Sequence, residues 1–283
     1  MKRREALEIL GAGCWGLGVG DWRLKTEDTR WRTQLNRIGI QLYTVRRDLA
    51  RDVEGTLARL AEIGFQEVEF AGYPKGTAAS LRAILDRHRL SAPSSHVSLQ
   101  SLRGEWDRTL DEAAALGQRY IVVAWVDASE RRTIDDWKRI AALFNRSAES
   151  AQSRKIQFAY HNHDFELAPI EGQLGYDVLL AETDPKLVRF EMDIYWITKG
   201  GKDPLDYFAR YPGRFPLLHV KDMDATARKG FADLGTGVID FKRVFQRAKQ
   251  AGVRHYFYEQ DVTPGSPFDS ARIALDYLKG LRF

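Results

Sequence analysis

The chain has 283 residues and a formal net charge of +4, with 43 lysines and arginines against 39 aspartates and glutamates. Apolar residues make up 44% and charged residues 29%, an ordinary globular composition with enough apolar material for a large core. The positive charge is spread along the chain, so nucleic-acid binding is not expected. The single cysteine, Cys14, excludes an intrachain disulfide and a cysteine-rich zinc site.

The first residues differ in character from the rest of the chain. Arg3 and Arg4 precede a glycine-rich apolar stretch that resembles a twin-arginine export leader and is too short to span a bilayer. Glu8 interrupts this stretch, and a frayed terminal helix of a cytoplasmic protein is the alternative. We therefore expect an export-type leader, which would direct the protein to the periplasm, or a disordered N-terminus at residues 1–30, followed by one domain at residues 31–283.

From Ile38 onward, short β-branched or aromatic runs alternate with amphipathic segments that end near a glycine. One helix is predicted over Val53–Ile63, where Leu57 and Leu60 lie on one apolar stripe and Gly64 follows as a stop signal. The pattern predicts eight strands, over Ile38–Tyr43, Gln66–Phe70, Ser91–His96, Tyr120–Trp125, Lys155–Tyr160, Leu187–Met192, Phe215–Val220 and His255–Glu259.

Eight repeats of a strand and a helix favour one closed (β/α)8 TIM barrel, an α/β fold. Strands that alternate with helices pair in parallel through right-handed crossovers, and eight such units close the sheet. An open doubly wound sheet is the alternative, but no glycine-rich dinucleotide turn follows the first predicted strand. In a barrel, the C-terminal ends of all strands face one bowl, where residues far apart in sequence meet.

Polar residues stand where four of the apolar runs stop, in the motifs YHNH, MDIYW, LLHVKD and YFYEQD. Imidazole and carboxylate groups are suitable ligands for Mn, Co, Zn, Fe or Mg. One divalent metal ion is therefore predicted, with His161, Asp193, His219 and Glu259 as ligands, because their strands are neighbours in the barrel. Any one of these histidines alone is more easily explained as structural, so the prediction rests on the set.

Other polar or aromatic residues near the predicted strand ends are candidates for binding a substrate. These candidates are Glu69, His96, Trp125, Tyr195 and Trp196. Lys221 lies on the same strand face as His219. Two roles are possible for Lys221: proton transfer, or an ion pair with Asp222.

The loop LGTGVIDF at 234–241 is predicted to enter a helix at Ile239 and to seat a phosphate or sugar hydroxyls. The alternative is a tight loop that needs positive φ.

These motifs together resemble the sugar phosphate isomerase/epimerase family, the xylose isomerase-like TIM barrels, over Arg37–Phe283. The resemblance implies a divalent ion held by strands five to eight, with Asp193, His219 and Glu259 at the family's Asp, His and Glu positions. At the fifth strand, His161 stands where ketose epimerases carry a glutamate that works with the last-strand glutamate. Glu166 lies five residues later. Enzymes of the endonuclease IV type need a histidine where this chain has Trp196, so a DNA-repair role is not expected.

The leading functional hypothesis is a metal-dependent isomerase or epimerase that acts on a carbohydrate or keto-sugar through an enediolate. Glu259 and His163 are the candidate bases, and Lys221 or His96 would move the oxygen proton. The first alternative is a lyase or dehydratase that eliminates from a keto-sugar or 3-keto-glycoside. The second is a sugar-binding barrel without catalysis. The expected partner is a small-molecule carbohydrate, with no nucleic acid and no membrane span, and a homo-oligomer is left open.

Overall fold

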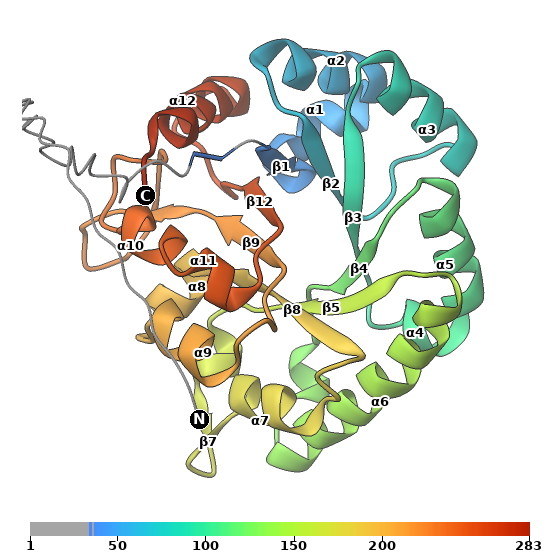
Figure 1. Cartoon of the computed structure of the whole chain (residues 1–283), viewed down its shortest axis with the longest axis vertical. Coiled ribbons are helices and arrows are strands. Elements are labelled where there is room, and N and C mark those ends of the chain that lie inside the picture. The colour runs from blue at the N-terminus through green and yellow to red at the C-terminus, as the bar shows by residue number, and fades with distance from the viewer. Residues whose placement is uncertain (1–33, 36) are drawn as a thin grey trace, which may run out of the picture. The chain divides into compact units, whose positions relative to one another are not determined.

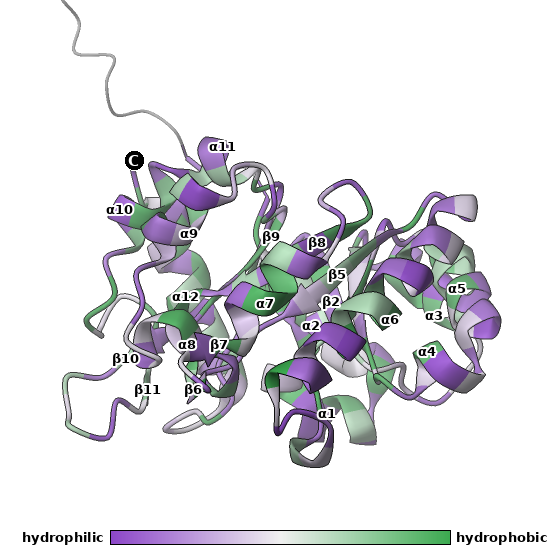
Figure 2. Ribbon diagram, turned by 90° about the horizontal axis from the view of Figure 1, so that it is seen from below, coloured by the Kyte–Doolittle hydropathy of each residue, from purple (hydrophilic) through white to green (hydrophobic). Residues whose placement is uncertain are grey.

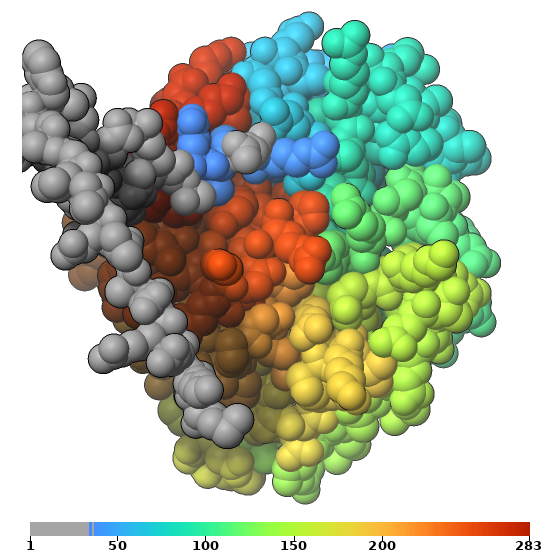
Figure 3. Space-filling view, viewed as in Figure 1, coloured from blue at the N-terminus to red at the C-terminus, as the bar shows by residue number. Residues whose placement is uncertain are grey.

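The computed structural model describes residues 34, 35 and 37–283, so the leader proposed at residues 1–30 lies outside the described residues, as does the domain boundary at residue 31. Eight parallel strands close into a barrel in the order β1-β12-β9-β8-β5-β4-β3-β2 (Figure 1). The predicted (β/α)8 TIM barrel is therefore confirmed. In the space-filling view, the colour bands follow one another around the barrel, because each β/α unit packs beside the next (Figure 3).

The barrel strands lie close to their predicted positions. They are β1 (Gly39–Gln41), β2 (Glu67–Ala71), β3 (Ser91–Val97), β4 (Tyr120–Val123), β5 (Gln157–His161), β8 (Val188–Asp193), β9 (Leu217–Val220) and β12 (His255–Tyr258). The first strand is shorter than expected because the side chain of Gln41 accepts a hydrogen bond from the Tyr43 amide and starts the 3-10 helix η1 (Leu42–Val45). Strands β4 and β12 also end earlier than predicted, so Trp125 and Glu259 lie just past their ends.

Helices follow each barrel strand, and both hydrophilic and hydrophobic segments appear along them in Figure 2, as expected for amphipathic helices. The helices are α1 (Arg46–Arg51), α2 (Val53–Ile63), α3 (Ala78–Arg87), α4 (Ser101–Gly104), α5 (Trp106–Ala115), η2 (Ala128–Glu130), α6 (Ile134–Ser153), η3 (Phe165–Leu167), α7 (Gly175–Glu182), α8 (Ile194–Lys199), α9 (Pro204–Arg210), α10 (Phe241–Phe245), α11 (Ala248–Ala251) and α12 (Pro267–Gly280). Two small hairpins pair β6 (Pro169–Ile170) with β7 (Gln173–Leu174) and β10 (Asp222–Met223) with β11 (Phe231–Ala232).

Helix α2 has the bounds that the sequence predicts. Its N-cap Asp52 accepts a hydrogen bond from the Gly55 amide, and Gly64 ends the helix at a φ of +113°. An L-residue with a side chain rarely adopts that conformation, which explains why a glycine stands at the stop.

The apolar core has two parts. A large layer lies between the strands and the helices, and a small cluster of Tyr120, Val122, Ala159, Leu217 and Phe257 forms separately from it. Residues two apart on a strand point to the same face. The residues of this small cluster therefore lie on the same strand faces as the polar side chains at the strand ends. The Phe257 ring leaves no room for a side chain at Gly39, where a Cβ atom would lie 2.4 Å from it.

A buried hydrogen-bonded pair, His255 and Glu67, lies at the opposite end of the barrel from the strand C-termini. His255 Nδ1 is 2.7 Å from Glu67 Oε2, and Arg37 contacts the other oxygen at 3.2 Å. This pair joins the starts of β12 and β2 and is part of the scaffold.

Among the described residues, none of the helices has the length and apolar character needed to cross a membrane.

Candidate active site

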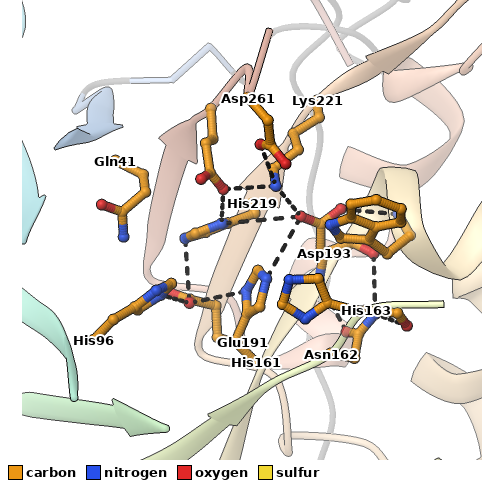
Figure 4. A network of polar contacts seen from close by, with 12 residues as sticks. Gln41, His96, His161, Asn162, His163, Glu191, Asp193, His219, Lys221 and Asp261 are labelled. Carbon is orange, nitrogen blue, oxygen red and sulfur yellow. Dashed lines mark hydrogen bonds and ion pairs between the residues drawn. The ribbon is translucent and has the colours of Figure 1, made fainter. Parts of the chain in front are cut away.

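The C-terminal ends of the barrel strands bring a set of buried and half-buried titratable side chains together (Figure 4). The set comprises Glu69, His96, His161, Glu191, Asp193, His219, Lys221, Glu259 and Asp261. Side chains alternate between the two faces of a strand, so residues two positions apart point the same way. Glu191 and Asp193 on β8, and His219 and Lys221 at β9, reach the site for this reason.

Three of the four predicted metal ligands, Asp193, His219 and Glu259, form one group of donor atoms, whereas His161 belongs to a second group that shares only His219 with the first. His219 Nδ1 is 2.8 Å from Glu259 Oε2 and 4.0 Å from Asp193 Oδ2, and His161 Nε2 is 3.8 Å from the same Asp193 oxygen. Donor atoms of Asp193, His219 and Glu259 all lie within 4.8 Å of one another. The register explains the meeting, because Asp193 pairs with His219 across β8 and β9.

Local hydrogen bonds hold Asp193 in place. Its Oδ1 accepts from the Trp196 amide and so caps α8, while Asn162 at the end of β5 accepts from the Asp193 amide at 3.0 Å. Capping uses one carboxylate oxygen and leaves Oδ2 directed at the cluster. Burial raises the pKa of Asp193 to about 6.

Each of the two predicted histidine ligands has its second nitrogen beside a buried carboxylate. His219 Nε2 lies 2.6 Å from Glu69 Oε2, and His161 Nδ1 lies 3.2 Å from Glu191 Oε2. Carboxylates in this position commonly fix the orientation and tautomer of a metal-binding imidazole. Sequence reasoning missed Glu191, although its spacing of two from Asp193 places both on one face. Glu69, predicted to bind substrate, lies beneath the imidazoles and is fully buried.

These residues fit a divalent cation. Two buried carboxylate oxygens, Glu69 Oε1 and Glu191 Oε1, find no hydrogen-bond partner among the residues that the structure describes. A buried polar atom without a hydrogen-bond partner is costly, and a mixed set of imidazoles and carboxylates is typical of a site for a divalent metal. A second group of donor atoms, from His96, His161, Glu191 and His219, also lies within 4.8 Å.

Lys221 contacts three carboxylates. Its Nζ lies 2.7 Å from Glu259 Oε2, 3.0 Å from Asp193 Oδ2 and 3.0 Å from Asp261 Oδ1. Burial alone would lower the pKa of Lys221, but these carboxylates outweigh it and raise the pKa well above its usual value. The same ammonium, together with His219, overcomes the effect of burial on Glu259 and lowers the pKa of that carboxyl well below its usual range.

His96 and His163 have opposite protonation tendencies. Burial lowers the pKa of an imidazole, but Glu69 and Glu191 outweigh it at His96 and raise its pKa to about 9. At His163 burial dominates, Lys221 adds to it, and the pKa falls to about 3. Near neutral pH, His96 is therefore an imidazolium and His163 a neutral imidazole.

Glu166 is turned away from this group. Its Oε1 accepts from the Tyr160 hydroxyl at 2.5 Å, and its Oε2 accepts from the His163 amide at 2.9 Å. Burial raises the pKa of Glu166 to about 7.

A cavity with a volume of about 480 Å³ opens over the site. It is lined by Tyr43, Ala71, His96, Ala124, Trp125, His161, His163, Asp164, Phe165, Trp196, Lys221, Glu259 and Asp261. Three predicted substrate-binding residues, His96, Trp125 and Trp196, are thus part of the wall. Tyr195 is not: its hydroxyl donates to the Lys229 carbonyl, and 1% of the residue is exposed. A larger cavity, about 580 Å³, lies beside the β6–β7 hairpin and contains none of these side chains.

The loop at 234–241 does not present its amides to a ligand. The amides of Gly235 and Gly237 donate to Asp222 Oδ2, and the amide of Ile239 donates to Asp222 Oδ1. The prediction of a phosphate seat is therefore wrong, because the protein's own carboxylate occupies these donors. Gly235 has a φ of +89°, which fits the alternative of a tight loop. The following helix α10 begins at Phe241, two residues later than predicted.

The comparisons with known proteins agree with this architecture. A curated inosose dehydratase from Lacticaseibacillus casei is 27% identical over 267 residues, which cover 77% of this chain and 88% of the relative. A solved sugar phosphate isomerase/epimerase from Parabacteroides distasonis is 27% identical and has a TM-score of 0.76, covering 87% of this chain and 98% of that one. A 3-keto-D-glucoside 4-epimerase from E. coli, 16% identical with a TM-score of 0.66, covers 87% of this chain and 99% of its own and shares the fold.

The relatives named above are enzymes of two classes, a lyase on one side and isomerases or epimerases on the other. A family model described as xylose isomerase-like TIM barrel matches residues 57–281, which is most of the barrel. The chain therefore belongs to the xylose isomerase-like TIM barrel family.

Proposed function

We propose that the protein is a metal-dependent lyase that eliminates an oxygen substituent from a keto-sugar. An isomerase or epimerase is the second candidate. Both reactions begin when a base takes a proton from the carbon next to a carbonyl. They differ afterwards: in elimination the oxygen on the next carbon leaves, whereas in isomerisation or epimerisation the proton returns to carbon.

The position of Glu166 is the observation that carries the lyase proposal. Ketose epimerases, which the sequence resembles, use two carboxylates on opposite faces of one carbon. Here His161 stands at the fifth-strand position, and both oxygens of Glu166 are engaged by Tyr160 and the His163 amide. The cavity therefore pairs Glu259 with imidazoles instead of a second glutamate from this strand.

A divalent cation held by His161, Asp193, His219 and Glu259 would polarise the substrate carbonyl and make the adjacent C–H more acidic. His163, which lines the cavity, takes the carbon proton, with Glu259 as the alternative base. The electron pair of that C–H bond forms the new C=C bond as the C–O bond to the leaving oxygen breaks.

His96 supplies the proton that the leaving oxygen needs. Its Nε2 lies 2.7 Å from Glu191 Oε2, which holds the imidazolium at the cavity wall. The leaving group departs as water or an alcohol, and a proton passes from His163 to His96 through solvent to complete the cycle. Against the effect of burial, Lys221 keeps Glu259 ionised by lowering the pKa of that carboxyl, and it offers positive charge to the developing oxyanion.

The second candidate is supported by the similarity to the P. distasonis isomerase/epimerase over nearly the whole of that chain. Its chemistry would use the same cation and the same bases, with the proton returned to carbon.

Incubation of metal-loaded protein with keto-sugars and 3-keto-glycosides in deuterated water separates these reactions. Release of the β-substituent with a new conjugated absorbance supports the lyase. Deuterium uptake next to the carbonyl without release contradicts it and supports the isomerase. Binding without exchange or release would contradict both and identify a sugar-binding barrel without catalysis.

The ligand set has its own test, which needs no turnover. Wild-type protein is expected to retain about one divalent ion per chain after gel filtration, measured by elemental analysis, and Asp193→Ala to retain almost none. The matched control is Asp276→Ala, an exposed aspartate on α12. A full complement of ion in Asp193→Ala would refute the ligand set.

A further inference from the structure

Exposed aromatic side chains gather at the cavity. The large apolar side chains that the described part of the chain leaves exposed are Tyr43, Trp125, Val238, Val262 and Ile273. Two of them, Tyr43 at 42% exposure and Trp125 at 53%, line the same cavity. Apolar side chains that are both exposed and gathered at a cavity mark a surface that a ligand covers.

Trp125 is held in position although it is exposed. Its ring packs edge-on against Phe165, with centroids 5.1 Å apart, and against His163 at 5.3 Å. The guanidinium of Arg131 lies 3.5 Å from the centroid of the Phe165 ring and donates to the Val126 carbonyl. The indole is therefore ordered before a ligand arrives, which lowers the entropic cost of packing a second ring against it.

Among the lining residues that the structure describes, none is an arginine or an unpaired lysine that could bind a phosphate group. Three carboxylates, from Asp164, Glu259 and Asp261, line the cavity. Lys221 is the one lysine or arginine among the lining residues that the structure describes, and it already contacts Asp193, Glu259 and Asp261. A phosphorylated sugar would therefore find no arginine among these lining residues for bidentate binding of its phosphate, and the lysine is already paired.

We propose that the cavity takes an uncharged glycoside whose sugar ring lies against His96 and Lys221 and whose planar, apolar aglycone packs on Trp125. The cavity volume of about 480 Å³ lies within the range of roughly 300–1,000 Å³ for cavities that bind drug-sized molecules, which leaves room for a ring beyond the sugar. The assignment of the sugar end rests on the proposed function, whereas the aglycone end rests on Trp125 and its surroundings.

Calorimetric titration with unreactive probes tests the proposal. Phenyl β-D-glucoside is expected to bind about tenfold more tightly than methyl β-D-glucoside, because the phenyl ring covers the indole. Glucose 6-phosphate is expected to bind no more tightly than glucose. The preference for phenyl should disappear in Trp125→Ala and persist in Trp125→Phe and in Ile273→Ala, which removes an exposed apolar side chain outside the cavity.

Two results would overturn the proposal. The first is that phenyl glucoside binds no more tightly than methyl glucoside, which includes the case in which neither binds. The second is that glucose 6-phosphate binds more tightly than glucose. The test is independent of the reaction. Elimination from a methyl 3-keto-glucoside without a preference for phenyl would leave the proposed function standing and refute the aglycone site. A preference for phenyl that is lost in Trp125→Ala would support the aglycone site. If no keto-sugar then showed proton exchange or release, the aglycone site would stand and the proposed function would be refuted.

Discussion

Replacing Asp222 by asparagine should destabilise the protein strongly, because this buried carboxylate accepts four backbone hydrogen bonds. Oδ2 accepts from the Gly235 and Gly237 amides, and Oδ1 accepts from the Met223 and Ile239 amides, at 2.8–3.2 Å. Asparagine keeps one oxygen and puts an NH₂ group at the other, where two amide donors would face it. Hydrogen bonds to a charged group contribute about 1.5–3 kcal/mol each, so losing two costs about 3–6 kcal/mol.

The lower end of that range applies here, because the loop is partly exposed and water can satisfy some of the released amides. Urea unfolding followed by tryptophan fluorescence should show a loss of about 3 kcal/mol at an unchanged m-value. The control is Asp224→Asn, a less buried carboxylate in the same segment that accepts from Thr226, where we expect a clearly smaller loss of stability. A loss in Asp222→Asn no larger than in the control would refute the role of Asp222.

Three further substitutions test other parts of the barrel. The pKa of Glu166 is raised to about 7 in the folded protein, so its contribution to stability is fully present below its usual pKa and is lost as pH rises through 7. Between pH 5 and 8 the wild type should therefore lose up to about 3 kcal/mol relative to Glu166→Gln in urea unfolding, and parallel profiles would contradict this. Gly39→Ala forces a methyl group against Phe257 and should cost about 1–3 kcal/mol, seen as a lower Tm; an unchanged Tm would show that the ring can move. Glu67→Gln at the opposite end should lower stability by about 1–3 kcal/mol through His255 while leaving metal content unchanged, and a loss of metal would contradict the separation of the two ends.

The barrel could be predicted because its signals are local. Each strand reads as a short apolar run and each helix as an amphipathic stripe with a stop, so α2 has its predicted bounds from Val53 to Ile63. Periodicity also places side chains two apart on one face of a strand. Once the strands close in sequence order, the polar residues at their C-terminal ends must share one bowl, which is why Asp193, His219 and Glu259 could be expected to meet there. The metal-ligand role of the full set with His161 stays a prediction.

The tertiary structure decided what each polar group contacts, since that depends on distances across the barrel that no local pattern encodes. Only the packed barrel places Glu69 and Glu191 behind the imidazoles, and only the fold turns Glu166 toward Tyr160. The contacts of the loop at 234–241 were also not predictable from the local sequence. Its glycines indicate a tight turn in the sequence, but whether their amides face a ligand or a carboxylate depended on Asp222, which reaches them after the chain leaves β9.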